Sequence, residues 1–331
     1  MLRFLLCPIL MFVLLGIAAP VALAQDDDPI RVDAALVRLN IGVVDGRGRP
    51  ITQLNRTNFS VFEDGVKQDI ARFETTTAPF SVVVLLDMSG STKTFRQNIR
   101  LSASRFLDAL ASDDRIAVVE FYSKIRLLND FTTDKRRAAE SIQLANGQGQ
   151  TDLYKAVEFA LQRLERENTR RKAIVVLTDG IDTEAQDRDR RLLSDLEDDK
   201  IPSFLKTEDN AKLNEILDRA DRQGVTIYPL ALPTGDPARL ADPTPRQVEM
   251  FRVARSRLKY IADRTGGTLN TIQRLEEMGR LYAEVAADLR TLYTIEYAPT
   301  NLARDGKWRE IRVEVNESGL ISRTRQGYFA R

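Results

Sequence analysis

The sequence contains no histidine and a single cysteine, Cys7. Cys7 lies in an apolar N-terminal segment that we expect to be removed on export, so the mature chain has neither residue type. Their absence excludes a disulfide framework, zinc sites built on thiolate or imidazole ligands, and Ser-His-Asp or Cys-His nucleophilic catalysis. Oxygen atoms remain as the ligands for any metal ion.

The chain also has no excess of charge of one sign. It has 49 Lys plus Arg and 48 Asp plus Glu, and Arg3 is the single charged residue among residues 1–24, so the remainder has 48 of each sign. A neutral balance gives no electrostatic footprint for nucleic acid or for a polyanionic surface. We therefore expect no nucleic-acid partner.

Long apolar runs are confined to the N-terminus. Arg3 precedes an apolar run from Phe4 to about Ala19, and Ala22–Ala24 offers small residues for cleavage. This pattern predicts a secretory signal peptide at residues 1–24. The alternative is an uncleaved anchor, because the run is near the lower limit for a membrane span. With no later span expected, the sequence indicates a secreted or periplasmic protein of a bacterial envelope.

The rest of the chain is organised around one apolar run and the loop after it. Val82–Leu86 is typical of a parallel strand that is covered on both faces. Asp87, Ser89 and Ser91 follow at i, i+2 and i+4, where the sheet opens at its carboxyl edge. One carboxylate and two hydroxyls in this pattern suit a hard cation such as Mg²⁺. The alternative is a Ser-rich helix cap in which Asp87 bonds backbone amides.

Two later segments favour the metal site. Thr151 stands at the start of an amphipathic helix, and Asp179 ends a second buried strand as Asp87 ends the first. Asp-x-Ser-x-Ser, a loop Thr before a helix and a strand-terminal Asp-Gly together resemble the metal-ion-dependent adhesion site of von Willebrand factor type A (VWA) domains. All five signature positions match, and the resemblance covers roughly Phe80–Asn270.

The resemblance implies a Rossmann-like, mostly parallel sheet wrapped by helices, and a protein that binds rather than catalyses. By this resemblance, Ser89, Ser91 and Thr151 supply hydroxyls to a divalent cation, Mg²⁺ with Ca²⁺ or Mn²⁺ as alternatives. Asp87 and Asp179 act directly or through water. The remaining coordination position takes an Asp or Glu carboxylate of a protein partner, in adhesion, envelope assembly or scaffolding.

Other functional classes stay open at this stage. A strand-terminal Asp with Mg²⁺ also describes phosphohydrolases that form an aspartyl phosphate. Such sites usually need a second acid two residues after the nucleophile, and here that position is Ser89. A metal-free structural module is a further alternative. Gly147-x-Gly149 resembles part of a dinucleotide-binding loop, but no buried strand precedes it and the glycine spacing is incomplete.

The chain is long enough for one core of about 200 residues and a smaller unit. Strand and helix signals alternate over residues 80–290 and predict a VWA-like α/β domain there. Residues 29–79 show period-two alternation and a hairpin around Asp64-Gly65, and residues 291–331 contain three expected strands, at 292–297, 308–315 and 321–329. Because about 50 residues are thin for a core, we expect both ends to build one small β-sandwich.

Further elements of the α/β domain follow from their apolar periods. We expect helices at 95–110, 134–142, 153–164, 211–220, 246–265 and 275–290, and strands at 116–121, 124–128, 225–230 and 269–272. Pro229 disfavours one of these strands. The charge-dense insertion Glu184–Lys200 predicts a solvated helix or loop. Because it follows Asp179, the alternative is that it shapes access to the site.

Overall fold

The computed structural model of the protein describes residues 36–167 and 169–331. The expected signal peptide and the first residues after it lie outside this part of the chain. No helix within the described ranges is both long and apolar enough to cross a membrane.

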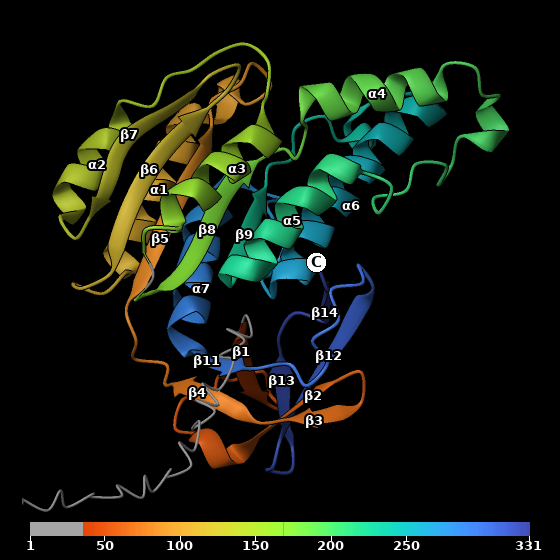
Figure 1. The fold of residues 1–331 in the computed structure, drawn as a ribbon. Helices are drawn as coiled ribbons and strands as arrows, with labels where there is room; N and C mark the ends of the chain where they lie inside the picture. The colour runs from red at the N-terminus through yellow and green to blue at the C-terminus, as the bar shows by residue number, and fades with distance from the viewer. Residues whose placement is uncertain (1–35, 168) are drawn as a thin grey trace, which may run out of the picture. The chain divides into compact units, whose positions relative to one another are not determined.

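A six-stranded sheet forms the centre of the α/β part (Figure 1). Its order is β10-β9-β8-β5-β6-β7, and every neighbouring pair is parallel except β6 with β7. Its strands are β5 (Phe80–Asp87), β6 (Arg115–Phe121), β7 (Ile125–Thr132), β8 (Arg171–Thr178), β9 (Val225–Ala231) and β10 (Asn270–Thr271). All residues of β5, β8 and β9 are buried, as expected of strands covered on both faces. The predicted mostly parallel sheet is confirmed.

Helices cover both faces of this sheet, and the six that the apolar period predicts are all present. One face packs against α1 (Arg96–Ala109), α2 (Lys135–Gln143) and α7 (Met278–Thr291). The other packs against α3 (Leu153–Leu164), α5 (Ala211–Gln223) and α6 (Pro245–Thr265). Gly224 and Gly266 end α5 and α6 at φ +63° and +76°, a conformation that favours glycine.

One strand is longer than predicted, and the strand that contains Pro229 is present as predicted. The edge strand β7 extends to Thr132 rather than residue 128, because its antiparallel pairing with β6 continues to that residue. Pro229 lies inside β9 although proline disfavours strands. Residues 227 and 229 of β9 present their backbone nitrogens to the same edge of the strand. At this edge the Ile227 N–H donates to Thr265 Oγ1 at 3.0 Å, and β10 pairs with β9 only from Leu230 onward. The missing N–H of Pro229 therefore faces a side where β9 has no strand partner at that position.

Strands from both chain ends form two four-stranded antiparallel sheets. One has the order β13-β1-β11-β4 and the other β14-β12-β2-β3. Their strands are β1 (Val37–Asp45), β2 (Phe59–Glu63), β3 (Val66–Gln68), β4 (Ile70–Glu74), β11 (Leu292–Tyr297), β12 (Trp308–Val315), β13 (Leu320–Arg323) and β14 (Gly327–Phe329). Leu39, Val61, Ile295 and Val313 belong to one apolar cluster that both sheets share. The predicted all-β sandwich from N- and C-terminal strands is confirmed.

Within this sandwich, the hairpin at Asp64-Gly65 is present, with φ +48° and +79° at the two turn residues. The prediction of a single strand at 321–329 is wrong. This segment is divided into β13 and β14, which pair with β1 and β12 in different sheets. All described residues belong to one compact unit. We propose that an α/β domain at residues 80–290 is inserted between two segments, residues 29–79 and 291–331, which together form the sandwich.

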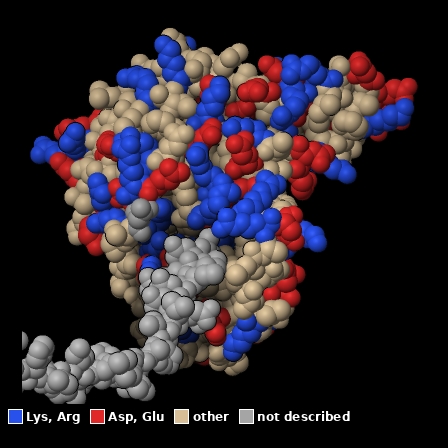
Figure 2. All heavy atoms as spheres, in the orientation of Figure 1, with Lys and Arg blue, Asp and Glu red and all other residues tan. Residues whose placement is uncertain are grey.

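The charged insertion forms α4 (Thr183–Leu193) and a short 3₁₀ turn, η3 (Asp198–Lys200). Figure 2 shows basic and acidic side chains intermingled on the visible face. Most charged residues of α4 are at least partly exposed, but Asp189 is 2% exposed and accepts a hydrogen bond from Arg257 Nη2 at 2.9 Å. The expectation of a solvated segment is therefore wrong at Asp189, because α6 supplies a buried cation to pair with it.

Arg171, the first residue of β8, joins the two connections between the sandwich and the α/β part. The side chain is 1% exposed, and its guanidinium donates to the carbonyl oxygens of Thr76 at 2.9 Å, Ala78 at 2.9 Å and Leu292 at 2.6 Å. It also lies 3.9 Å from the centroid of the Phe80 ring. Burial lowers the pKa of Arg171 to about 10. One side chain thus holds the segment that enters the α/β part and the segment that leaves it.

We expect Arg171→Met to lower the free energy of unfolding by about 3 kcal/mol, because three buried carbonyl groups lose their donor. The saved cost of burying a guanidinium keeps the loss from being larger. Chemical denaturation of the two proteins measures the difference. Arg166→Met, at an exposed position, serves as the control and should change stability by less than about 0.5 kcal/mol. Equal stability of the two variants would contradict the role of Arg171.

Candidate metal centre

Asp87 ends β5 at the carboxyl edge of the sheet and is completely buried. Its Oδ1 accepts a hydrogen bond from the Ser89 N–H at 3.0 Å, and its Oδ2 accepts one from Thr178 Oγ1 at 2.7 Å. Thr178 ends β8, the neighbouring parallel strand. The pairing of the two strands therefore places the Thr178 hydroxyl beside the carboxylate and orients it.

The loop after β5 is held closed by hydroxyl groups. Thr92 is buried, and its Oγ1 donates to the carbonyl oxygens of Asp87 at 2.8 Å and Ser89 at 3.1 Å. The hydroxyl oxygens of Ser89 and Ser91 lie 3.1 Å apart. Ser89 is buried whereas Ser91 is exposed, so the pair reaches from the interior to the surface.

Neither serine caps a helix. The turn η2 (Lys93–Phe95) and α1 both begin without a side-chain cap hydrogen bond. Asp87 accepts a single hydrogen bond from a backbone amide within the described residues, that of Ser89. The expectation that these serines cap a helix is therefore wrong, whereas Asp87 does accept from a backbone amide, as that alternative expected.

The loop before α3 contacts the loop after β5. The Gly90 N–H donates to the Gly149 carbonyl at 2.8 Å, and a Cβ at Gly90 would lie 3.4 Å from the same oxygen. Thr151 follows in this second loop and is 4% exposed. Its N–H donates to Thr183 Oγ1 and its carbonyl accepts from the Thr183 N–H, both at 2.9 Å. Thr151 is thus fixed to the start of α4, in a loop that contacts Gly90.

Asp179 directly follows β8 and is 2% exposed. Its Oδ1 accepts from the Ile181 N–H at 3.1 Å, and its Oδ2 accepts from Thr234 Oγ1 at 3.2 Å. Gly180 turns the chain here with φ +82°, and a Cβ at this position would lie 2.7 Å from Leu258 Cδ1. A residue with a side chain would be strained at this turn and would collide with α6.

The two carboxylates interact electrostatically. Burial, and then the charge of Asp179, raises the pKa of Asp87 to about 7, while hydrogen bonds from Ser89 and Thr178 act in the opposite direction. Neither acid forms an ion pair among the residues that the structure describes. Arg255 on α6 donates to the Leu232 carbonyl instead, and burial lowers its pKa. Two neighbouring buried acids with adjacent hydroxyls and no paired side-chain cation fit a divalent cation.

The structure therefore places Asp87, Ser89 and Ser91 in one loop, Asp179 at the end of the adjacent strand, and Thr151 in a loop that contacts the first. The described residues contain no cluster of three or more His, Cys, Asp or Glu side chains suited to a metal. A site of two carboxylates and three hydroxyls has too few acids to form such a cluster.

Sequence reasoning missed three hydroxyl groups that contact these candidate ligands or their loop. Thr178 stands directly before Asp179 at a strand end, so its position in the sequence offered a signal. Thr92 ends the same loop as Ser91, and the sequence offered the same kind of signal. Thr234 lies 55 residues beyond Asp179, and its contact with that carboxylate arises only through the fold.

Residues 82–181 match the family described as von Willebrand factor type A domain. No curated protein matches this chain in sequence. Among solved structures, a von Willebrand factor type A protein from Catenulispora acidiphila is 13% identical with a TM-score of 0.48, covering 91% of this chain. This chain spans 64% of that protein's length.

Two other solved structures also match this chain. The vWF domain of the type V pili tip protein Mfa5 from Porphyromonas gingivalis is 14% identical with a TM-score of 0.48, covering 64% of this chain and 95% of that one. Proximal thread matrix protein 1 from the mussel byssus, with a zinc-occupied MIDAS motif, is 15% identical with a TM-score of 0.47, covering 66% and 47%. The match over residues 82–181 identifies this segment, which lies within the helix-covered six-stranded sheet, as a von Willebrand factor type A domain.

Proposed function

We propose that this protein binds another protein through a divalent cation held by Asp87, Ser89, Ser91, Thr151 and Asp179. The observation that carries the proposal is the pair of buried carboxylates on neighbouring strands, bordered by hydroxyls and without a paired side-chain cation among the described residues. Mg²⁺ suits such a set because it prefers oxygen ligands, needs few carboxylates and keeps several waters. Ca²⁺ or Mn²⁺ are the alternatives.

The chemistry of the donors explains how a partner would bind. Neutral hydroxyl groups leave a divalent cation under-neutralised, so that it attracts a further anionic oxygen. Ser91 is exposed, and the cation would therefore be accessible from the surface at this side. An Asp or Glu carboxylate of the partner protein fits the open position. The surface around the site would supply most of the binding energy.

Binding in this proposal occurs without turnover. A phosphohydrolase that forms an aspartyl phosphate would need an acid near Asp87 to exchange protons with the leaving group. The residue two positions later is Ser89, whose hydroxyl contacts Ser91, and the chain has no histidine. With the expected export signal, a secreted or periplasmic role in adhesion, envelope assembly or scaffolding fits. Release of phosphate from a generic phosphate ester would contradict this.

The proposal is tested by capturing partners from bacterial envelope extract on the immobilised mature protein, in Mg²⁺ and in EDTA. We expect at least one protein to be retained in Mg²⁺, released by EDTA, and lost when its surface carboxylates are amidated. Asp87→Asn serves as the cation-site control in parallel. Partners retained equally in EDTA, or an unchanged melting temperature on adding Mg²⁺, Ca²⁺ or Mn²⁺, would assign the domain to the metal-free structural class.

A further inference from the structure

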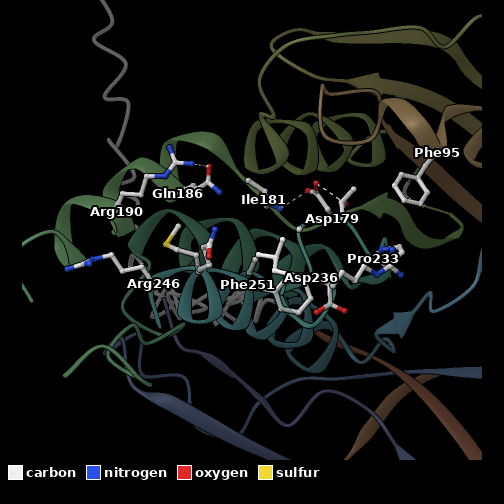
Figure 3. A pocket seen from close by; sticks show the side chains of 16 residues that line it. Phe95, Asp179, Ile181, Gln186, Arg190, Pro233, Asp236, Arg246 and Phe251 are labelled. Carbon is white, nitrogen blue, oxygen red and sulfur yellow. Dashed lines mark hydrogen bonds between the residues drawn. The ribbon is translucent and has the colours of Figure 1, made fainter. Parts of the chain in front are cut away.

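A groove of about 700 Å³ adjoins the candidate metal centre (Figure 3). It is bordered by α4, by the loop after β9 with its short turn η4 (Pro237–Arg239), and by α6. Asp179 is one of its lining residues, so the groove opens beside the position expected for the cation. This volume is in the range of pockets that hold ligands in proteins.

The groove combines an apolar floor with basic side chains. Ile181, Pro233, Met250 and Phe251 contribute apolar surface, and Phe95 lies at one end in Figure 3. The Arg255 guanidinium is 4.8 Å from the centroid of the Phe251 ring. Apolar surface of this kind, open to solvent beside a polar site, is typical of a place where a partner's side chains bind.

Three arginines line the groove, namely Arg190 on α4, Arg239 in η4 and Arg246 on α6, and all three are exposed. The Arg239 side chain forms no hydrogen bond or ion pair within the described part of the chain. Arg190 pairs with Asp187 at 2.9 Å and Arg246 with Asp198 at 3.4 Å, with 61% and 45% of the arginine side chains exposed. Exposed pairs of this kind are weak, so Arg190 and Arg239 are available to an incoming carboxylate. Arg246 also donates to the carbonyl oxygens of Leu196 at 2.9 Å and Leu193 at 3.4 Å, and is held more firmly.

The charges around the groove favour an anionic occupant. Asp179 and Asp236 are its two acidic lining residues, and Asp179 would be neutralised by a bound cation. The lining of the groove then has three positively charged arginines and one remaining negative charge, that of Asp236. In Figure 3 Arg190 and Arg246 lie at the end away from Phe95, with Asp179 between. The groove thus has the expected cation site at one position and a basic end at another, with the apolar floor between them.

We infer that the groove receives an acidic segment of the partner protein in which two acidic residues are separated by apolar ones. The first carboxylate binds the cation, the apolar side chains lie on the floor, and the second carboxylate binds the groove arginines. This inference rests on the proposed function and adds the chemistry of the partner segment. The α4 insertion, which supplies Gln186 and Arg190 to the groove, takes part in recognition.

The test selects random 12-residue displayed peptides on the full mature protein in Mg²⁺, with elution by EDTA. The selected peptides are then measured by fluorescence anisotropy on wild type, on Arg190→Gln/Arg239→Gln, and on Arg188→Gln. Arg188 is an exposed arginine of α4 that does not line the groove, so it controls for charge on the same helix. Thermal melting checks that the variants fold, which we expect because the replaced side chains are exposed.

We expect peptides that contain two acids separated by apolar residues. Their affinity for the double variant should fall at least about 10-fold and stay unchanged for Arg188→Gln. Peptides with one acid, or equal binding to the double variant, would overturn the groove inference and leave the cation proposal standing. Self-association of the protein that the double variant abolishes would overturn it in favour of a second copy. A selection without EDTA-eluted peptides would overturn the cation proposal and the inference with it.

Discussion

Replacement of Asp87 by asparagine is expected to weaken Mg²⁺ binding by at least about 100-fold, since loss of even an outer partner of a metal ligand costs 10–100-fold. The fold should persist because asparagine has the same shape and its oxygen still accepts from the Ser89 N–H. The Thr178 hydroxyl can turn to accept rather than donate. Removing one of two neighbouring buried charges should leave the metal-free protein at least as stable as wild type.

Calorimetric titration with Mg²⁺ measures the affinity, and circular dichroism and thermal melting in EDTA measure the fold. Asp152→Asn is the matched control. Asp152 lies next to Thr151 and pairs with Lys155 at 3.2 Å, so it carries the same charge in the same region without contacting Asp87. It should bind Mg²⁺ nearly as wild type does. Undiminished affinity in Asp87→Asn would show that the cation, if bound, is held elsewhere.

A fragment of residues 29–79 is expected to be unfolded by itself. β1 pairs with β11 and β13, and β4 pairs with β11, so both strands lose every strand partner in the fragment. β2 loses β12 and keeps only the hairpin with β3. An isolated two-stranded hairpin is marginal in water. The shared apolar cluster also loses Tyr293, Ile295, Tyr297, Ile311 and Val313.

Far-UV circular dichroism and the dispersion of amide proton signals in NMR distinguish the outcomes. The fragment should give the spectrum of a disordered chain, whereas residues 29–331 should unfold cooperatively under the same conditions. Cooperative unfolding of the fragment alone would refute the proposed discontinuous domain, and would show that the N-terminal strands form their own core.

The sequence by itself predicted the elements that carry the site. The apolar run Val82–Leu86 ending at Asp87, and a second such run ending before Asp179, are local patterns, and they place both acids at the carboxyl edge of the sheet. The period-two segments at both ends, each too short for a core, likewise indicated one shared β unit. These features follow from short windows of sequence, because strand and helix periods are properties of neighbouring residues.

Only the tertiary structure decided which distant groups contact these residues. It sets β8 beside β5, so that Thr178 donates to Asp87, and it brings Thr234 to Asp179 and Arg257 to Asp189. It also gathers the connections before β5 and after α7 at Arg171. No local pattern encodes such contacts, because they depend on strand order and helix packing across the whole chain. The sequence thus determined where the candidate site residues lie at the ends of strands, and the fold determined which groups form hydrogen bonds with them.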